Sequence, residues 1–207
     1  MEVAVRCERV SALLPDDESF AVACRALPDW RRRKCDALRF AQDRRRSVAA
    51  WLLLGQVLAM RGLQADNQSV SETEFGKPVF DRMPDVHFSI SHAGDRVMVA
   101  VSDAPVGCDV EPIGSVDDSV CRGALSADEF RCLEAVPAGN GRDREFCRLW
   151  TRKESYLKAL GRGLDLDPRG FSIRDGRVPS GWQLTDFDFG DGYCGCVCAV
   201  AGAVIRR

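Results

Sequence analysis

The chain has 207 residues, enough for one large domain or two small domains packed together. It is 45% hydrophobic and 29% charged, with a net charge of −2, and this balance excludes a disordered tail, a collagen and a strongly basic nucleic-acid binder. The longest apolar runs fall short of the roughly 20 residues that a membrane-spanning helix needs. The sequence therefore predicts a soluble globular protein.

The first ten residues and the cysteines bear on the cellular compartment. Charges at Glu2, Arg6, Glu8 and Arg9 lie where a secretory signal would have an uninterrupted apolar region, so we expect a cytoplasmic protein. The ten cysteines are expected to be reduced thiols, because a chain of this length needs no disulfides to build a core. Three of them alternate as in a strand, which favours a buried strand face over a metal site: Cys194, Cys196 and Cys198.

A basic segment, residues 28–46, stands out against an otherwise acidic chain. It holds eight lysines and arginines and three aspartates, a net charge of +5, so the remaining residues sum to −7. On helices, such a segment forms either an anion-attracting surface or an ordinary solvated face. Composition alone does not separate these two interpretations.

Three helices are predicted in the first quarter of the chain, at residues 16–26, 30–40 and 43–61. The third is the best defined, because apolar residues recur at three- and four-residue spacing until Gly62 ends the helix. A polar loop follows, and Gly76-Lys77-Pro78 opens a β-rich stretch. Strands are predicted at residues 87–91, 97–102 and 106–111, the first two joined by a turn at 93–95.

The second half repeats the order of helices followed by strands. A capping box at Ser126–Glu129 precedes a helix at residues 130–136, a long amphipathic helix covers 143–160, and several strands lie within 171–204. This order predicts an α+β fold that consists of a pseudo-symmetric pair of similar α/β halves. We place their boundary near Ala104, with residues 1–104 in the N-terminal half and 105–207 in the C-terminal half.

Two carboxylates mark a candidate site at the end of a predicted strand. The period of two sends Asp109 and Glu111 to one face while Val110 packs on the other, so the two carboxylates can share one ion. Acidic residues in this position, with Pro112 ending the strand, are also common as exposed loop carboxylates. Both interpretations stay open on this evidence.

The long helix adds an acid and a base. Trp150, Glu154 and Lys158 are successive i, i+4 neighbours that border its apolar stripe, although a surface ion pair would have the same spacing. Together with Asp109 and Glu111, Glu154 would form an oxygen donor set suited to Mg²⁺ rather than zinc. Nearby lysines and arginines then favour substitution at phosphorus.

The two histidines and the absence of known nucleotide-binding motifs indicate how a phosphate ligand would be bound. His87 is expected to be structural, whereas His92, beside Ser91 at the mouth of a turn, either contacts a phosphate or makes strand-end hydrogen bonds. The sequence has neither G-x-x-x-x-G-K-[ST] nor G-x-G-x-x-G. No P-loop is therefore expected, and Gly161-Arg162-Gly163 is interpreted as a helix stop.

Four motifs, in this order and spacing, resemble those of the Sfp-type 4′-phosphopantetheinyl transferases. They are Gly76-Lys77-Pro78, Phe88-Ser89-Ile90-Ser91-His92, Gly107-Cys108-Asp109-Val110-Glu111, and a run from Phe146 to Leu164 that contains Trp150-Thr151-x-Lys153-Glu154-Ser155-x-x-Lys158. The resemblance implies two α/β halves with coenzyme A bound between them in a monomer. It also implies transfer of 4′-phosphopantetheine to a serine of an acyl or peptidyl carrier protein, with release of adenosine 3′,5′-bisphosphate.

The resemblance also implies roles for individual residues. Asp109, Glu111 and Glu154 would bind Mg²⁺, Lys158 would contact the pyrophosphate of coenzyme A, and Glu154, or Glu111 through a water, would take the proton of the serine. The nucleotide end, including its 3′-phosphate, would be held by Lys77, Ser91 and His92. Further coenzyme A contacts are expected in the basic segment, at Arg31, Lys34, Arg46 and Ser47.

The carrier protein is expected to dock on residues 116–136, called here the docking segment, partly through electrostatic attraction. Ser89, Ala93 and Cys108 differ from the residues that the family often has at these positions, but none of the three differences removes a charge. One alternative is a non-catalytic protein that binds coenzyme A or a nucleotide. A second is a nucleic-acid surface on the arginine-rich helices, which the shortage of base-reading groups there disfavours. We therefore expect neither a nucleic acid nor a membrane as partner.

Overall fold

The computed structural model describes residues 1–64, 69–174 and 178–207. Its helices are α1 (Val10–Leu13), α2 (Asp17–Ala26), α3 (Asp29–Asp36), α4 (Ala41–Met60), α5 (Asp118–Ala124), α6 (Ala127–Glu134) and α7 (Asn140–Leu160), with 3₁₀ turns η1 (Gly163–Asp165) and η2 (Pro168–Gly170). Its strands are β1 (Glu2–Arg9), β2 (Val70–Glu72), β3 (Pro78–Phe80), β4 (His87–Ala93), β5 (Arg96–Ser102), β6 (Val106–Pro112), β7 (Trp182–Asp188), β8 (Tyr193–Val200) and β9 (Val204–Arg206).

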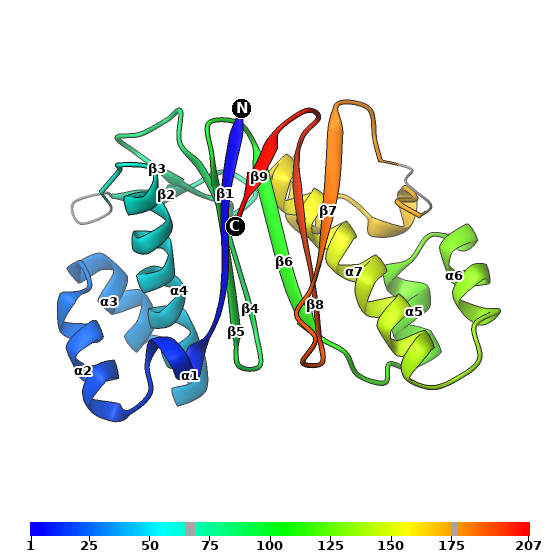
Figure 1. Cartoon of the computed structure of the whole chain (residues 1–207), viewed down its shortest axis with the longest axis horizontal. Coiled ribbons are helices and arrows are strands. Elements are labelled where there is room, and N and C mark those ends of the chain that lie inside the picture. Colours follow the sequence, from blue (N-terminus) through cyan, green and yellow to red (C-terminus); the bar gives the residue numbers. More distant parts are fainter. Residues whose placement is uncertain (65–68, 175–177) are drawn as a thin grey trace.

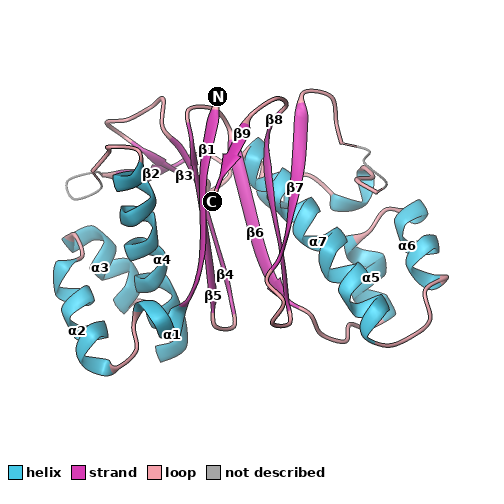
Figure 2. Ribbon diagram, in the orientation of Figure 1, coloured by secondary structure: helices cyan, strands magenta, loops and turns pink. Residues whose placement is uncertain are grey.

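Two main sheets stand side by side in the middle of the molecule, with α1–α4 on one outer side and α5–α7 on the other (Figures 1 and 2). The first sheet has the strand order β4-β5-β1-β9 and the second the order β6-β8-β7, while β2 and β3 form a separate pair. Pairing is antiparallel throughout, except that β9 runs parallel to β1. The last strand of the chain therefore joins the sheet of the first half.

The two halves share one topology. In each, a strand is followed by helices and then by a hairpin whose second strand pairs antiparallel with the first strand: β1, α4 and β4-β5 in one half, β6, α7 and β7-β8 in the other. The long helices, of 20 and 21 residues, occupy equivalent places in this order. The predicted α+β fold with pseudo-symmetric halves is confirmed.

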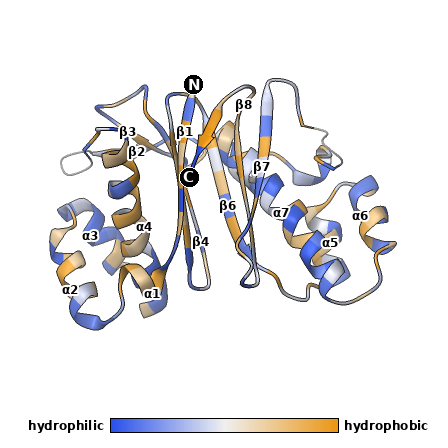
Figure 3. Ribbon diagram, in the orientation of Figure 1, coloured by the Kyte–Doolittle hydropathy of each residue, from blue (hydrophilic) through white to orange (hydrophobic). Residues whose placement is uncertain are grey.

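The hydrophobic core has a layer on each face of the first sheet. Along β5, Val97, Val99 and Val101 pack on the side of α4, whereas Met98 and Ala100 point into the space between the two sheets. This division follows directly from the period of two of a strand. Outside the core, α3 carries four of the eight basic residues of the basic segment and is coloured as hydrophilic in Figure 3, and the start of α4 carries three more.

Most elements match the sequence-based predictions, including the capping box at the start of α6 and the alternating cysteines, which are buried on β8. The helix expected at 30–40 is α3, which ends at Asp36, because the chain leaves the helix before Phe40 caps α4. The helix expected at 130–136 is α6, which begins at Ala127 directly after its Ser126 cap and ends at Glu134. The strand β1 and the helix α5 were not predicted. Part of the predicted polar loop, residues 65–68, lies outside the described residues.

Two further observations concern the chain as a whole. All ten cysteines are free thiols. Over the described ranges, we find no helix that combines the length and the apolar character needed to cross a membrane.

Gly107 allows α7 to approach β6 closely. A Cβ atom at this position would lie 1.9 Å from the carbonyl oxygen of Ser155 and 2.5 Å from the amide nitrogen of Ala159, both in α7. These are backbone atoms, which cannot turn away as a side chain can. A residue larger than glycine would therefore push α7 away from β6.

We predict that Gly107→Ala lowers the free energy of unfolding by about 1–3 kcal/mol, because overpacking displaces α7. Gly55→Ala is the matched control, since no atom lies within 4 Å of a Cβ at this helical position; it should raise stability by about 0.5–1 kcal/mol. Urea unfolding measures both. Equal stability of Gly107→Ala and the wild type would contradict the close approach.

Candidate active site

The candidate site lies where the two halves meet, along the neighbouring strands β4 and β6. These strands belong to different sheets, and serine hydroxyls connect them. The Oγ of Ser89 accepts a hydrogen bond from the amide of Cys108 at 3.0 Å, and the Oγ of Ser91 accepts one from the amide of Val110 at 3.3 Å. The first half therefore fixes the strand on which the predicted acidic residues lie.

Asp109 lies at the centre of this seam and is 2% exposed. Its Oδ1 accepts hydrogen bonds from the Oγ of Ser91 at 2.7 Å and from the Nζ of Lys158 at 2.6 Å. Its Oδ2 is buried and has no hydrogen-bond partner. A buried carboxylate oxygen is costly unless it has a partner. Oδ2 is therefore free to bind a further cation.

Glu111 and Glu154 belong to the same electrostatic cluster. Cys108 and Val110 pack into the core between the sheets, so Asp109 and Glu111 project from the opposite face of β6. Burial raises the pKa of Glu111 to about 7, and the negative charges of Asp109 and Glu154 contribute, against a lowering effect of Lys158. Burial also raises the pKa of Glu154, with Asp109 adding to it and Lys158 opposing it.

Lys158 is the cation of this cluster. Burial disfavours its charged form, but the negative charge and hydrogen bond of Asp109 together with the charges of Cys108 and Glu154 outweigh that effect, and the pKa of Lys158 is raised above its ordinary value. Lys158 is therefore an ammonium at neutral pH. One end of α7 thus brings a fixed positive charge to the seam, next to the predicted metal residues.

The three predicted metal residues offer the hard oxygen ligands that Mg²⁺ prefers. The Oδ2 of Asp109 has no hydrogen-bond partner and burial raises the pKa of Glu111 and of Glu154, so a nearby divalent cation would stabilise the charged form of all three. Within the described part of the chain, no three acidic, histidine or cysteine side chains converge closely enough to form a metal site. The three carboxylates are therefore of the right chemical type for Mg²⁺. In the structure, however, the cation that contacts Asp109 is the ammonium of Lys158.

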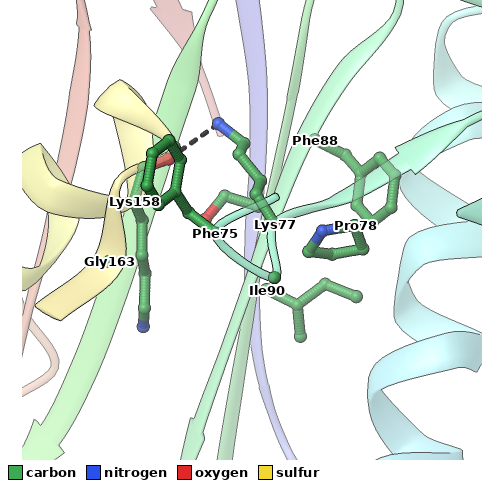
Figure 4. A pocket seen from close by; sticks show the side chains of 10 residues that line it. Phe75, Lys77, Pro78, Phe88, Ile90, Lys158 and Gly163 are labelled. Atoms are coloured by element: carbon green, nitrogen blue, oxygen red, sulfur yellow. Dashed lines mark hydrogen bonds between the residues drawn. The ribbon is translucent and has the colours of Figure 1, made fainter. Parts of the chain in front are cut away.

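Lys77 connects the first half to the C-terminal end of α7. Its Nζ donates to the carbonyl oxygens of Lys158 at 2.7 Å and Val106 at 3.1 Å, an arrangement that suits the negative end of a helix dipole. Burial lowers the pKa of Lys77 to about 8. Lys77, which was predicted to contact the nucleotide, thus points toward backbone carbonyls (Figure 4).

A cavity of about 220 Å³ adjoins Lys77. Figure 4 shows the labelled residues around it, which come from the start of β3 and the segment before it, from β4, from the end of α7 and from η1. Most of its walls are apolar, and the described lining residues are Phe75, Gly76, Lys77, Pro78, Phe88, Ser89, Ile90, Lys158, Gly161 and Gly163.

His92 and Arg46 lie together at the other end of the seam. His92 is near the end of β4, and desolvation lowers its pKa, with the cations Arg46 and Lys158 lowering it further. Arg46 donates to the carbonyl oxygen of Gly94 in the β4-β5 turn at 3.3 Å. His92 is therefore neutral at pH 7 and lies near cations from both halves.

The other predicted residues of the basic segment make contacts within the first half. Arg31 donates to the Oγ of Ser47 at 2.8 Å and packs over the ring of Trp51. Lys34 instead pairs with Glu72 of β2 at 2.5 Å. Arg31 and Ser47 are thus brought together, and they hold α3 on α4.

The structure reveals a buried ion pair that the sequence analysis left without a role, between Lys153 of α7 and Glu129 of α6. The sequence did contain one sign that Lys153 is buried, which is its position on the helix. Lys153 lies four residues from both Leu149 and Leu157, which are fully buried, so it belongs to the buried face of the helix.

A second cavity, of about 290 Å³, opens beside Glu111. Its walls are mainly apolar and come from the docking segment and from α7; the described lining residues are Glu111, Pro112, Gly114, Val116, Val120, Ala124, Phe146, Cys147 and Trp150. An apolar groove thus leads from the docking segment to the acidic cluster.

The raised pKa of Glu111 makes a testable prediction about metal-free protein. Its folded pKa of about 7 lies above its ordinary value of 4.5, so the folded state binds this proton more tightly and Glu111 destabilises the fold increasingly as pH rises from about 4.5 to 7. Glu111→Gln should therefore gain stability relative to the wild type between pH 4.5 and 8, as measured by urea unfolding in EDTA. A difference that stays constant with pH would contradict the prediction.

Comparison with known proteins agrees with this geometry. Residues 12–104 match the family model "4′-phosphopantetheinyl transferase, N-terminal" and residues 105–198 match the 4′-phosphopantetheinyl transferase superfamily. The chain is 35% identical over 145 residues to the transferase psf-1 of Bacillus pumilus, covering 70% of this chain and 62% of that protein.

Two further relatives extend over more of the chain. It is 32% identical over 181 residues to the transferase Sfp of Bacillus subtilis, covering 82% of this chain and 80% of that protein. It is 30% identical over 200 residues to a phosphopantetheinyl transferase of Thraustochytrium, covering 87% and 68%. The resemblance seen in the motifs is confirmed: the chain belongs to the 4′-phosphopantetheinyl transferase superfamily and is a transferase of that family.

Proposed function

We propose that this enzyme transfers the 4′-phosphopantetheine group of coenzyme A to a serine hydroxyl of an acyl or peptidyl carrier protein in a Mg²⁺-dependent reaction. The serine oxygen forms a bond to the phosphorus that bears pantetheine, the bond from that phosphorus to the bridging oxygen breaks, and adenosine 3′,5′-bisphosphate leaves. The observation that carries this proposal is the cluster of Asp109, Glu111, Glu154 and Lys158 at the seam of the two halves. No observation favours the non-catalytic alternative.

Lys158 and the three carboxylates have complementary roles in this proposal. Lys158 is a charged ammonium held at the seam by Asp109, where it can bind the pyrophosphate and offset negative charge on the leaving group. Asp109, Glu111 and Glu154 would hold Mg²⁺. When bound, the ion would polarise the phosphoryl oxygens and neutralise charge on the departing phosphate.

The base of the reaction is a carboxylate. Glu154 is our preferred acceptor of the serine proton, with Glu111 acting through a water as the alternative. Both carboxylates belong to the acidic cluster at the seam, where burial raises the pKa of each, and a carboxylate within reach of the serine hydroxyl can act as its general base.

The nucleotide end of coenzyme A is proposed to lie along the first half of the seam. The apolar cavity beside Lys158 offers a surface for the adenine ring. Arg46 near His92 offers positive charge for the 3′-phosphate. The proposed binding residues are Arg31, Lys34, Arg46, Ser47, Lys77, Ser91, His92 and Lys158.

The carrier protein is proposed to dock on the docking segment. Val120 on α5 is 53% exposed, and it lines the apolar groove that leads to Glu111. Because both halves of the site come from one chain, we propose that the enzyme acts as a monomer. We propose a cytoplasmic location, which suits ten free thiols.

Asp109→Asn and Glu154→Gln should each reduce kcat/KM for carrier loading at least about 100-fold, because both remove a charge on which the transition state depends. Intact-protein mass spectrometry of an apo-carrier incubated with enzyme, coenzyme A and Mg²⁺ measures the gain of phosphopantetheine. Glu145→Gln is the control on the same helix, since Glu145 pairs with Arg148 and should leave loading unchanged. Full turnover by either site variant would refute the assignment.

Removing divalent ions tests the metal part separately. In excess EDTA the enzyme should lose loading activity, and added Mg²⁺ should restore it, because the carboxylates then lack the cation that balances the pyrophosphate. The same mass measurement reports the result. Undiminished loading in EDTA would rule out the Mg²⁺ requirement while leaving the transfer reaction in place.

A further inference from the structure

The ion pair between Lys153 and Glu129 is fully buried. The Nζ of Lys153 lies 2.8 Å from the Oε2 of Glu129, and both side chains are 0% exposed. Lys153 directly precedes Glu154 on α7, while Glu129 belongs to α6 within the docking segment. The pair therefore joins α7, which carries Glu154 and Lys158, to the proposed carrier surface.

Lys153 also binds the segment that follows α7. Its Nζ donates to the carbonyl oxygens of Pro168 at 2.7 Å and Phe171 at 2.6 Å, and it lies 4.3 Å from the centre of the Phe171 ring. With Glu129, these contacts use all three ammonium hydrogens. One side chain thus ties α7 to α6 and to residues 168–171.

Glu129 is satisfied as completely. Its Oε2 accepts from the amide of Ser126 at 2.9 Å, which closes the capping box of α6, and its Oε1 accepts from the amide of Ile173 at 2.8 Å. These hydrogen bonds therefore fix the position of the N-terminus of α6 relative to α7, and they hold residue 173 beside it.

The pair does not face the reacting groups. It has no solvent access, and the cation that contacts Asp109 is Lys158. Lys153 is therefore not a catalytic residue. Nor is net stability a sufficient account of it, because replacing a buried ion pair with well-packed neutral residues is often neutral or stabilising. Hydrogen bonds have a fixed direction, so these contacts allow only one placement of the elements that they join.

We propose that Lys153 is a positioning residue, which through Glu129 sets how α5 and α6 sit against α7 and so aligns the carrier-docking surface with the acidic cluster. This inference rests on the proposed function. It predicts that loss of the pair weakens productive carrier binding while coenzyme A binding, on the other side of the seam, is unaffected.

The test uses the double variant Lys153→Met/Glu129→Gln, which removes both charges and leaves no unpaired buried ion. Its matched control is Arg152→Met/Asp186→Asn, which removes the neighbouring ion pair from α7 to β7, away from the docking segment. Loading kinetics give separate KM values for carrier and coenzyme A, and hydrogen exchange reports the amides of residues 116–136.

In the double variant, KM for the carrier should rise about 10-fold, KM for coenzyme A should stay within about 2-fold, and amides in residues 126–136 should exchange faster. The control should keep the wild-type carrier KM. A folded double variant with wild-type carrier KM would overturn the proposal, as would equal losses for carrier and coenzyme A.

If the double variant does not fold, Ser126→Ala tests the placement of Glu129 more gently, because it leaves the ion pair intact but removes the 2.9 Å hydrogen bond from the Oγ of Ser126 to the Oε2 of Glu129 that helps to orient it. A selective rise of the carrier KM supports the proposal, and an unchanged KM contradicts it. If the wild-type enzyme loads no apo-carrier, the proposed function fails. Hydrogen exchange of residues 116–136 then decides the positioning role alone: faster exchange in the variant supports it, and unchanged exchange refutes it.

Discussion

The contact of Lys158 with Asp109 is the interaction on which the site depends, because it joins two charges from segments 49 residues apart at the seam between the halves. Ser91 reaches the same carboxylate from the first half, so neither half builds the site alone. The close approach of α7 at Gly107 brings the helix to β6. Sheet, helix and hairpin thus converge on one buried carboxylate.

Duplicated topology explains why the seam has this form. Each half ends its sheet with a strand whose outer edge faces the other half, and serine hydroxyls bridge these strands where backbone pairing would otherwise fix the spacing. Side-chain bridges leave polar groups at the junction, which is where a charged ligand needs them. The buried Lys153–Glu129 pair extends the same principle outward, from α7 to α6.

The sequence predicted the local features well and the remote ones poorly. Helical spacing predicted α4 and α7, and strand alternation placed Asp109 and Glu111 on one face, since both patterns are set by nearby residues. Strand β1 was not predicted, because Val3, Ala4 and Val5 are buried in succession and the strand lacks the alternation that marks a half-buried strand. Lys153 showed its burial through its spacing from Leu149 and Leu157, but no spacing identifies Glu129 as its partner. The inward turn of Lys77 likewise depends on carbonyls that only the folded chain supplies.

Metal binding tests the central claim most directly, which is that the seam carboxylates form one divalent-cation site with Asp109 at its centre. Mn²⁺ can stand in for Mg²⁺ and be followed by electron paramagnetic resonance in the presence of coenzyme A. The wild type should bind a single Mn²⁺, and Asp109→Asn should lose it while keeping its fold by circular dichroism. Unchanged Mn²⁺ binding by a folded Asp109→Asn would contradict the account.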